Sequence, residues 1–261
     1  MDLGITNRVA MVLGAGGGLG GAIADALAGE GARVAACDIS DEALRICVDR
    51  VTQNGGTASA FPFDLANLHA AEEVVGSIES ALGHVEILVN ITGGPPPTKA
   101  SGVPADDWRR YFDSMVASVI HLTDRVLPQM RQAGWGRIVT STSSGVITPI
   151  PNLALSNSLR ASLVAWSKTL SGEVASDGVT ANIVAPGRIS TGRIRQLNEA
   201  RAQREGRTVE EVSSDSTKSI PAGRYGFPTE YADVVTFLSS ERASFISGSV
   251  IRVDGGMIPS I

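Results

Sequence analysis

The stretch RVAMVLGAGGGLGGAIADALAG, residues 8–29, decides the fold. Its first six residues predict a buried strand, and residues 18–29 predict a helix. The segment Gly14–Gly20 joins them through a turn and contains five glycines, which let the backbone approach a phosphate group closely. Such a turn places the phosphate at the positive end of the helix that follows it. We therefore expect a dinucleotide pyrophosphate to bind here, against Gly14, Gly18, Leu19 and Gly20.

Strands and helices alternate outward from this stretch along the whole chain, which indicates an α/β protein with a parallel sheet covered on both faces. The predicted helices are 18–29, 41–53, 67–82, 105–132, 153–176 and 229–240. We expect one Rossmann-type doubly wound domain over 1–261, with seven mostly parallel strands and a small helical lid at about 188–222. The predicted strands are Arg8–Leu13, Ala32–Asp38, Thr57–Phe61, Ile87–Asn90, Arg137–Ser141, Thr180–Val184 and Val250–Val253.

Composition and charge exclude several other classes of protein. The net charge of −5 argues against nucleic-acid binding, so we expect a small-molecule partner. The uncharged run Val9–Ala24 is shorter than the ~20 apolar residues of a membrane span, so no membrane segment is predicted. The two cysteines, Cys37 and Cys47, have no companions at metal-ligand spacing, and no metal site is expected. A cytoplasmic protein is the resulting expectation.

Asp38 ends the second predicted strand, where a carboxylate accepts both ribose hydroxyls of an adenosine and repels a 2′-phosphate. No arginine or lysine lies in the glycine turn or directly after Asp38. The sequence therefore favours NAD over NADP as cofactor. Asp64, followed by Leu65, comes after the third strand. Its carboxylate suits the adenine amino group and a turn or helix cap equally well.

The order of motifs resembles the short-chain dehydrogenase/reductase family, and within it the 3-oxoacyl-carrier-protein reductase-like group, over essentially the whole chain. The matching segments are Gly14-x3-Gly18-x-Gly20, residues 88–93, residues 136–139 leading to Ser143, residues 186–191 and residues 253–256. The resemblance implies further cofactor contacts from Asn90, Gly93, Pro186, Gly187 and Thr191. It also implies a homotetramer built on the two long apolar helices.

The catalytic positions depart from the family pattern of Asn, Ser, Tyr and Lys. In that family the Tyr lies thirteen residues beyond the Ser and the Lys four beyond the Tyr, which from Ser143 gives Ser156 and Arg160; the Asn position falls on Met115. An alkoxide is a far stronger base than a phenolate, so an aliphatic hydroxyl gives up its proton less readily than a phenol does. Ser156 therefore relays a proton less readily than Tyr. Arg160 stays protonated and is suited to gripping ribose hydroxyls or an oxyanion. We expect an atypical catalytic set of Ser143, Ser156 and Arg160.

Three functions remain open at this point. The first is an NAD(H)-linked oxidoreductase acting on a small carbonyl or alcohol, with Arg188, Arg193 and Arg195 either clamping an anionic substrate or serving as surface charges balanced by glutamates. The second is a non-redox elimination or dehalogenation enzyme, because halohydrin dehalogenases are similar at Arg160, although not at Ser156 or the glycine turn. The third is a catalytically silent dinucleotide-binding protein.

Overall fold

Seven parallel strands form one sheet in the order β3-β2-β1-β4-β5-β6-β7 in the computed structural model, which describes residues 1–261. The chain winds outward from β1 to β3 and then crosses back to β4, so the winding reverses between β1 and β4. Ligands of such sheets bind at the carboxyl ends of the strands beside this reversal. The strands are β1 (Val9–Leu13), β2 (Arg33–Asp38), β3 (Thr57–Pro62), β4 (Ile87–Asn90), β5 (Gly136–Ser141), β6 (Val179–Pro186) and β7 (Val250–Val253). All seven predicted strands are confirmed, and every neighbouring pair is parallel.

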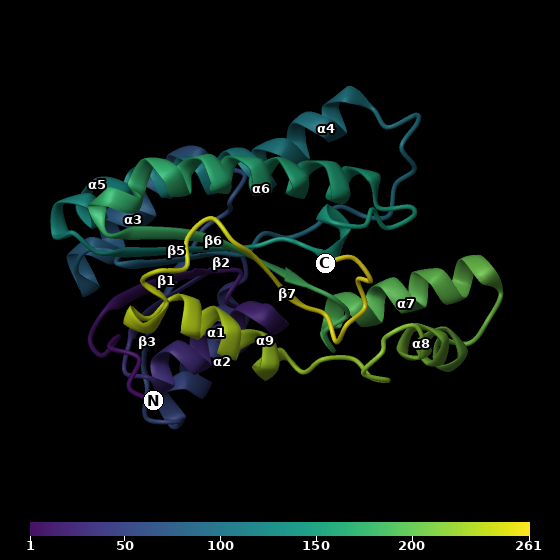
Figure 1. Cartoon of the computed structure of the whole chain (residues 1–261), viewed down its shortest axis with the longest axis horizontal. Coiled ribbons are helices and arrows are strands. Elements are labelled where there is room, and N and C mark those ends of the chain that lie inside the picture. Colours follow the sequence, from purple (N-terminus) through teal and green to yellow (C-terminus); the bar gives the residue numbers. More distant parts are fainter.

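Helices cover both faces of the sheet, as the sequence predicts for a doubly wound fold. Figure 1 shows α1, α2 and α9 on one face and α3, α5 and α6 on the other. The helices are α1 (Gly18–Gly29), α2 (Asp41–Gln53), α3 (Leu68–Leu82), α4 (Ala105–Phe112), α5 (Ser118–Ala133), α6 (Ala154–Val174), α7 (Gly192–Glu205), α8 (Val209–Lys218) and α9 (Pro228–Leu238). No helix has the length and apolar character needed to cross a membrane.

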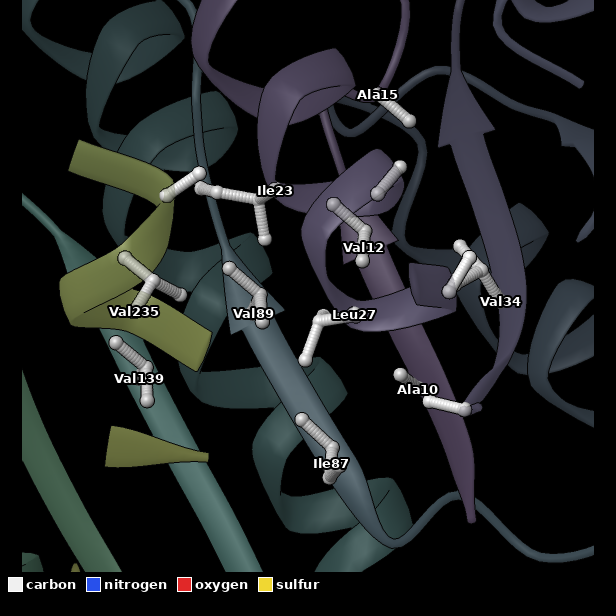
Figure 2. Close-up of a cluster of buried hydrophobic side chains, with 14 of the residues drawn as sticks. Ala10, Val12, Ala15, Ile23, Leu27, Val34, Ile87, Val89, Val139 and Val235 are labelled. Atoms are coloured by element: carbon white, nitrogen blue, oxygen red, sulfur yellow. The ribbon is translucent and has the colours of Figure 1, made fainter. Parts of the chain in front are cut away.

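The core has two layers because side chains along a strand alternate between the sheet faces. Val12 of β1 joins Val89, Leu27 and Val235 in the cluster beneath α1 and α9, which Figure 2 shows from within. Its neighbour Met11 joins the cluster on the opposite face, under α3 and α5. Both faces of β1 are thus buried. This packing fixes the position of the end of β1, where the glycine turn begins.

The predicted helix over 105–132 contains a break in hydrogen-bond pattern that the sequence does not reveal. A π-helical segment, Asp113–Ala117, separates α4 from α5 without interrupting the helix. Met115 lies in this segment and is buried against Val119 and Leu159. Apolar residues recur at three- and four-residue steps straight through this segment (Tyr111, Met115, Val119 and Leu122), so the sequence periodicity does not reveal it.

Residues between β6 and α9 form two helices, α7 and α8, which extend beyond the carboxyl end of the sheet in Figure 1. Internal ion pairs hold them, including Arg201–Glu205 and Arg207–Asp215. A capping box at Thr208 and Glu211 starts α8. The segment therefore has its own polar support beside the edge where ligands bind.

Candidate active site

The glycine turn is closed by a contact that tolerates no side chain. Gly14 has φ +64°, and its carbonyl accepts the Gly17 N–H at 2.9 Å. A Cβ on Gly20 would lie 2.1 Å from Gly14 O, well inside contact distance. The turn therefore requires glycine at both ends, and it holds the beginning of α1 directly above the end of β1.

Two helix N-termini without side-chain caps meet at this turn. Gly17 precedes α1 and Thr191 precedes α7, and neither side chain caps its helix. A Cβ on Gly18 would lie 3.0 Å from Thr191 Cγ2, so the two helix starts are neighbours. Each leaves backbone N–H groups and a positive dipole end for an anion. The sequence predicts the phosphate site at α1, with Leu19 half-buried in its first turn, but does not predict that α7 adds a second one.

Asp38 is held beside the glycine turn by two backbone N–H groups. Gly16 N–H donates to Oδ2 and Ser40 N–H to Oδ1, each at 3.1 Å. Each carboxylate oxygen keeps a lone pair for a further donor such as a ribose hydroxyl. The Asp38 carboxylate is therefore a fixed hydrogen-bond acceptor beside the glycine turn, available to a bound nucleotide.

A cavity of about 320 Å³ adjoins this turn and contains a charge that the sequence analysis missed. Arg50 of α2 lines it together with Gly16 and Gly21. Its Nε lies 2.7 Å from Asp25 Oδ2, so its charge is balanced inside the chain. Arg50 is twelve residues beyond Asp38, and only the packing of α2 on α1 brings it to the cofactor side.

Asp64 lies in a turn after β3. Its Oδ1 accepts the Ala66 N–H at 2.9 Å, and the side chain is exposed. Leu65 packs against the second core cluster. Asp64 therefore stabilises a turn, as one of the two predicted roles requires. Contact of Asp64 with an adenine stays a prediction.

Unpaired polar atoms gather at the carboxyl ends of β4 and β5. Asn90 Nδ2 donates to Thr140 Oγ1 at 3.2 Å, but its Oδ1 is buried without a partner. The hydroxyls of Thr92 and Thr142 are also buried and unpaired. Buried polar atoms normally have partners. Beside them, Gly93 leaves open space, since nothing lies within 4 Å of the position of a Cβ. These acceptors and hydroxyls fit a ribose that supplies O–H groups at this edge.

Arg160 crosses from α6 to this edge and ties three backbone carbonyls together. Its Nη1 donates to Ser141 O at 3.2 Å, and its Nη2 donates to Thr92 O at 3.2 Å and Gly93 O at 3.0 Å. Burial, together with the nearby charge of Arg193, lowers its pKa to about 10. The guanidinium is still charged at neutral pH. Three of its five N–H groups are used, so two remain for a ligand.

Ser143 and Ser156 lie on segments that pack together. Ser143 follows β5, and its Oγ accepts the Gly145 N–H at 3.1 Å, which leaves the hydroxyl hydrogen free to donate. Asn157 Oδ1 lies 2.3 Å from the position of a Cβ on Gly145, so the loop of Ser143 touches the start of α6. Ser156 is next to Asn157, half-buried and without a side-chain hydrogen bond. It shares a helix face with Arg160, four residues on.

Neither Lys168 nor Tyr231 takes the place of the absent pair. Lys168 Nζ lies 2.6 Å from the position of a Cβ on Gly248, whose N–H bonds Ala181 near the amino end of β6. That end is opposite the ligand edge. Tyr231 is fully buried and donates to Ser141 Oγ at 2.7 Å, and burial raises its pKa. Tyr231 therefore supports β5 from inside the core.

The Pro186-Gly187 turn is fixed by the C-terminal segment. Gly187 N–H donates to Val253 O at 2.9 Å, and a Cβ on Gly187 would lie 2.7 Å from Asp254 Cα. This close approach requires glycine. It helps to place the residues after β6, including Thr191, beside the beginning of α1.

Comparison with known proteins places this geometry among reductases. Residues 14–258 match the family described as Enoyl-(Acyl carrier protein) reductase. The 3-oxoacyl-[acyl-carrier-protein] reductase of Salmonella typhimurium is 34% identical over 252 residues, covering 96% of this chain and 97% of that protein. The 7alpha-hydroxysteroid dehydrogenase of Escherichia coli is 30% identical over 260 residues, covering 100% and 98%. The structure of L-sorbose reductase from Gluconobacter frateurii, complexed with NADPH and L-sorbose, matches with a TM-score of 0.94 and 29% identity over 100% of both chains.

Proposed function

This chain belongs to the short-chain dehydrogenase/reductase family of oxidoreductases, and we propose that within it the protein is an NAD(H)-linked enzyme for a small carbonyl or alcohol substrate, similar to 3-oxoacyl reductases. The observation that carries this proposal is the pair of uncapped helix N-termini, α1 and α7, that meet at Gly18 and Thr191. Two positive helix ends at one point suit a pyrophosphate.

The residues that would hold the dinucleotide form a continuous track. The glycine turn and Thr191 would bind the pyrophosphate, Asp38 would accept hydrogen bonds from the adenosine ribose hydroxyls, and Asn90 and Arg160 would bind the other ribose. Pro186 and Gly187 would fix the backbone near the nicotinamide. When bound, NADH supplies the hydride.

The choice of NAD over NADP depends on this chain's own residues, because L-sorbose reductase was solved with NADPH. Asp38 places a negative charge where a 2′-phosphate would bind, and backbone N–H groups hold it there. Arg50 is the one cation in the adjoining cavity, and Asp25 neutralises it. A 2′-phosphate would therefore meet repulsion without a free positive charge to offset it.

The altered catalytic residues stabilise charge on the substrate oxygen and leave proton delivery to solvent. The Ser143 hydroxyl donates to the substrate carbonyl oxygen, and one of the two free N–H groups of Arg160 stabilises the negative charge that forms on this oxygen when the carbon accepts hydride. Arg160 keeps its proton, so the alkoxide is protonated by water through the Ser156 hydroxyl. This substitution predicts slower turnover than a tyrosine acid would give.

Two further parts of the proposal concern the surroundings of the site. Residues 188–222, which contain α7 and α8, act as a lid over the substrate. The outer surfaces of α4, α5 and α6 join copies of the chain into a homotetramer, and the 44% exposed Phe112 is one apolar side chain available for this contact. Light scattering during gel filtration measures the assembly directly.

Absorbance at 340 nm over a panel of carbonyls with NADH, and of alcohols with NAD⁺, tests the proposed function. We expect coenzyme-dependent turnover that falls when Arg160 is replaced by Met. Turnover that survives removal of all nucleotide would indicate the elimination enzyme instead. Coenzyme binding with no turnover, together with new activity in Ser156→Tyr/Arg160→Lys, would indicate the silent binding protein.

A further inference from the structure

Two arginines at the candidate site, Arg160 and Arg193, lack an acidic partner. Neither has a carboxylate oxygen within 4.0 Å. By contrast, Arg201 of α7 and Arg207 of the following turn lie 2.8 and 2.6 Å from Glu205 and Asp215. Arg160 is buried, where a charged group usually has a partner, whereas Arg193 is exposed. The chain supplies no counter-charge for either.

The two guanidiniums meet at one loop residue. Arg193 Nη2 lies 3.6 Å and Arg160 Nη2 lies 3.8 Å from the position that a Cβ on Gly94 would take. Backbone carbonyls on either side hold them there: Pro95 O accepts from Arg193 at 2.6 Å, and Gly93 O accepts from Arg160 at 3.0 Å. Like charges held side by side repel each other, and the charge of Arg193 indeed lowers the pKa of Arg160.

The space between them is open and has donors to spare. Gly94 is exposed and has no side chain to fill this space. Arg193 uses only one of its five N–H groups, on Pro95, and its guanidinium can bind the two oxygens of a carboxylate. Both N–H groups of Arg160 Nη2 are bonded to the carbonyls of Thr92 and Gly93, so Arg160 adds its positive charge beside this space.

The cofactor pyrophosphate is the competing anion, and the geometry assigns it elsewhere. The two uncapped helix N-termini meet at Gly18 and Thr191. The arginine pair lies at the loop after β4, where Arg160 also donates to the carbonyl of Ser141. Ser141 is two residues before Ser143 in the chain. It therefore adjoins the residues proposed to bind the substrate oxygen.

We propose that Arg160 and Arg193 together bind a carboxylate of the substrate, so that the enzyme acts on an oxo acid in preference to a neutral ketone. This inference rests on the proposed function, because it names the substrate class of the same site. Arg193 enters from α7, so a bound acid also links that helix to the loop after β4. The acid supplies the counter-charge that neither arginine has within the chain.

Calorimetry with a matched pair of probes tests the inference. The probes are 3-oxobutanoate and its neutral methyl ester, titrated into protein saturated with NAD⁺, which cannot reduce a ketone. We expect the wild type to bind the acid at least about tenfold more tightly than the ester. Arg193→Gln is expected to weaken acid binding by roughly 10- to 100-fold, the range for a lost charged hydrogen bond, and to leave the ester unchanged. Arg204→Gln removes the same charge from the last turn of α7 and should match the wild type.

A second variant keeps both arginines and fills the space between them. Gly94→Leu is expected to block the acid, and the backbone at Gly94 is not in the left-handed region, so the substitution causes no strain there. Thermal unfolding of each variant checks that it is folded. Equal binding of acid and ester by the wild type, or no binding of the acid, overturns the inference.

The outcomes separate this inference from the proposed function. If NAD⁺ does not bind, the proposed function fails, and the same titrations without coenzyme still measure whether acid binding depends on Arg193. If NAD⁺ binds but Arg193→Gln weakens NAD⁺ and not the acid, then Arg193 belongs to the pyrophosphate and only the inference fails.

Discussion

Replacement of Asp38 by Asn tests the basis of coenzyme choice with little change in shape. The carboxylate is held by Gly16 and Ser40 N–H groups beside the expected adenosine ribose. Unit charges ~4 Å apart near a protein surface interact by about 4 kcal/mol. Asp38 is half-buried, so solvent screens part of this energy, and about 2–3 kcal/mol of repulsion toward a 2′-phosphate remains. We expect Asp38→Asn to lower the preference for NADH over NADPH by about 30- to 150-fold.

A second effect of the same change cancels in that ratio. An amide accepts from only one of the two N–H groups, because its nitrogen faces the other. The unpaired N–H costs about 1–3 kcal/mol, and it weakens binding of both coenzymes alike. The preference, measured as the ratio of the two Kd values by calorimetry, therefore reports what Asp38 does at the 2′ position: it repels a phosphate and accepts a hydrogen bond from a hydroxyl.

The control removes a nearby carboxylate that has no contact with the turn. Asp41 begins α2, three residues beyond Asp38, and is exposed. Asp41→Asn should leave the ratio within about twofold of the wild type, as expected for a screened surface charge. A ratio that does not change in Asp38→Asn, or a wild type that prefers NADPH, would refute the reasoning.

Three further changes test other parts of the account. Gly20→Ala should weaken NADH binding by at least about tenfold in calorimetry, because its Cβ would lie 2.1 Å from Gly14 O, whereas Gly76→Ala on α3 meets nothing within 4 Å and should stabilise the fold slightly; equal NADH affinity in both would contradict the turn geometry. Arg160→Met should lower kcat by about 10²–10³-fold, and wild-type kcat/KM should decline only above pH about 10, as the guanidinium with its lowered pKa loses its proton; a decline near neutral pH would implicate another group. The hydrogen bond from Arg224 lowers the pKa of Glu230 to about 2, so the contribution of the Glu230 carboxylate to stability is complete above the ordinary carboxyl pKa and is lost as the pH falls toward 2. The urea midpoint should therefore drop less between pH 5 and pH 3 in Glu230→Gln than in the wild type. An equal drop in both proteins would contradict the ion pair.

The layered fold could be predicted because its determinants are local. Strand β1 is a run of five buried apolar residues, and the glycine turn directly follows it. Asp38 was placed correctly at the end of β2 for the same reason, since a strand end is readable from the sequence around it. The expected helix over 105–132 does not reveal the π-helical segment, because apolar residues recur at three- and four-residue steps straight through it.

The charged parts of the site could not be predicted, because they depend on contacts between distant segments. Arg193 meets Arg160 only through the loop at Gly94, and nothing near either arginine in the sequence indicates this. Arg188, Arg193 and Arg195 have similar sequence contexts, yet only Arg193 reaches that loop. The second helix N-terminus at Thr191 follows from the close approach of Gly187 to Asp254, which is also a contact between remote residues.

Transfer of deuterium from [4-²H]NADH to product tests the central claim most directly. With the best carbonyl substrate of the panel, the account predicts one deuterium on the carbon that becomes the alcohol, delivered from one face of the coenzyme only. Product that lacks deuterium with both the 4R- and the 4S-labelled coenzyme, or no turnover of any carbonyl by protein that binds NADH, would contradict it.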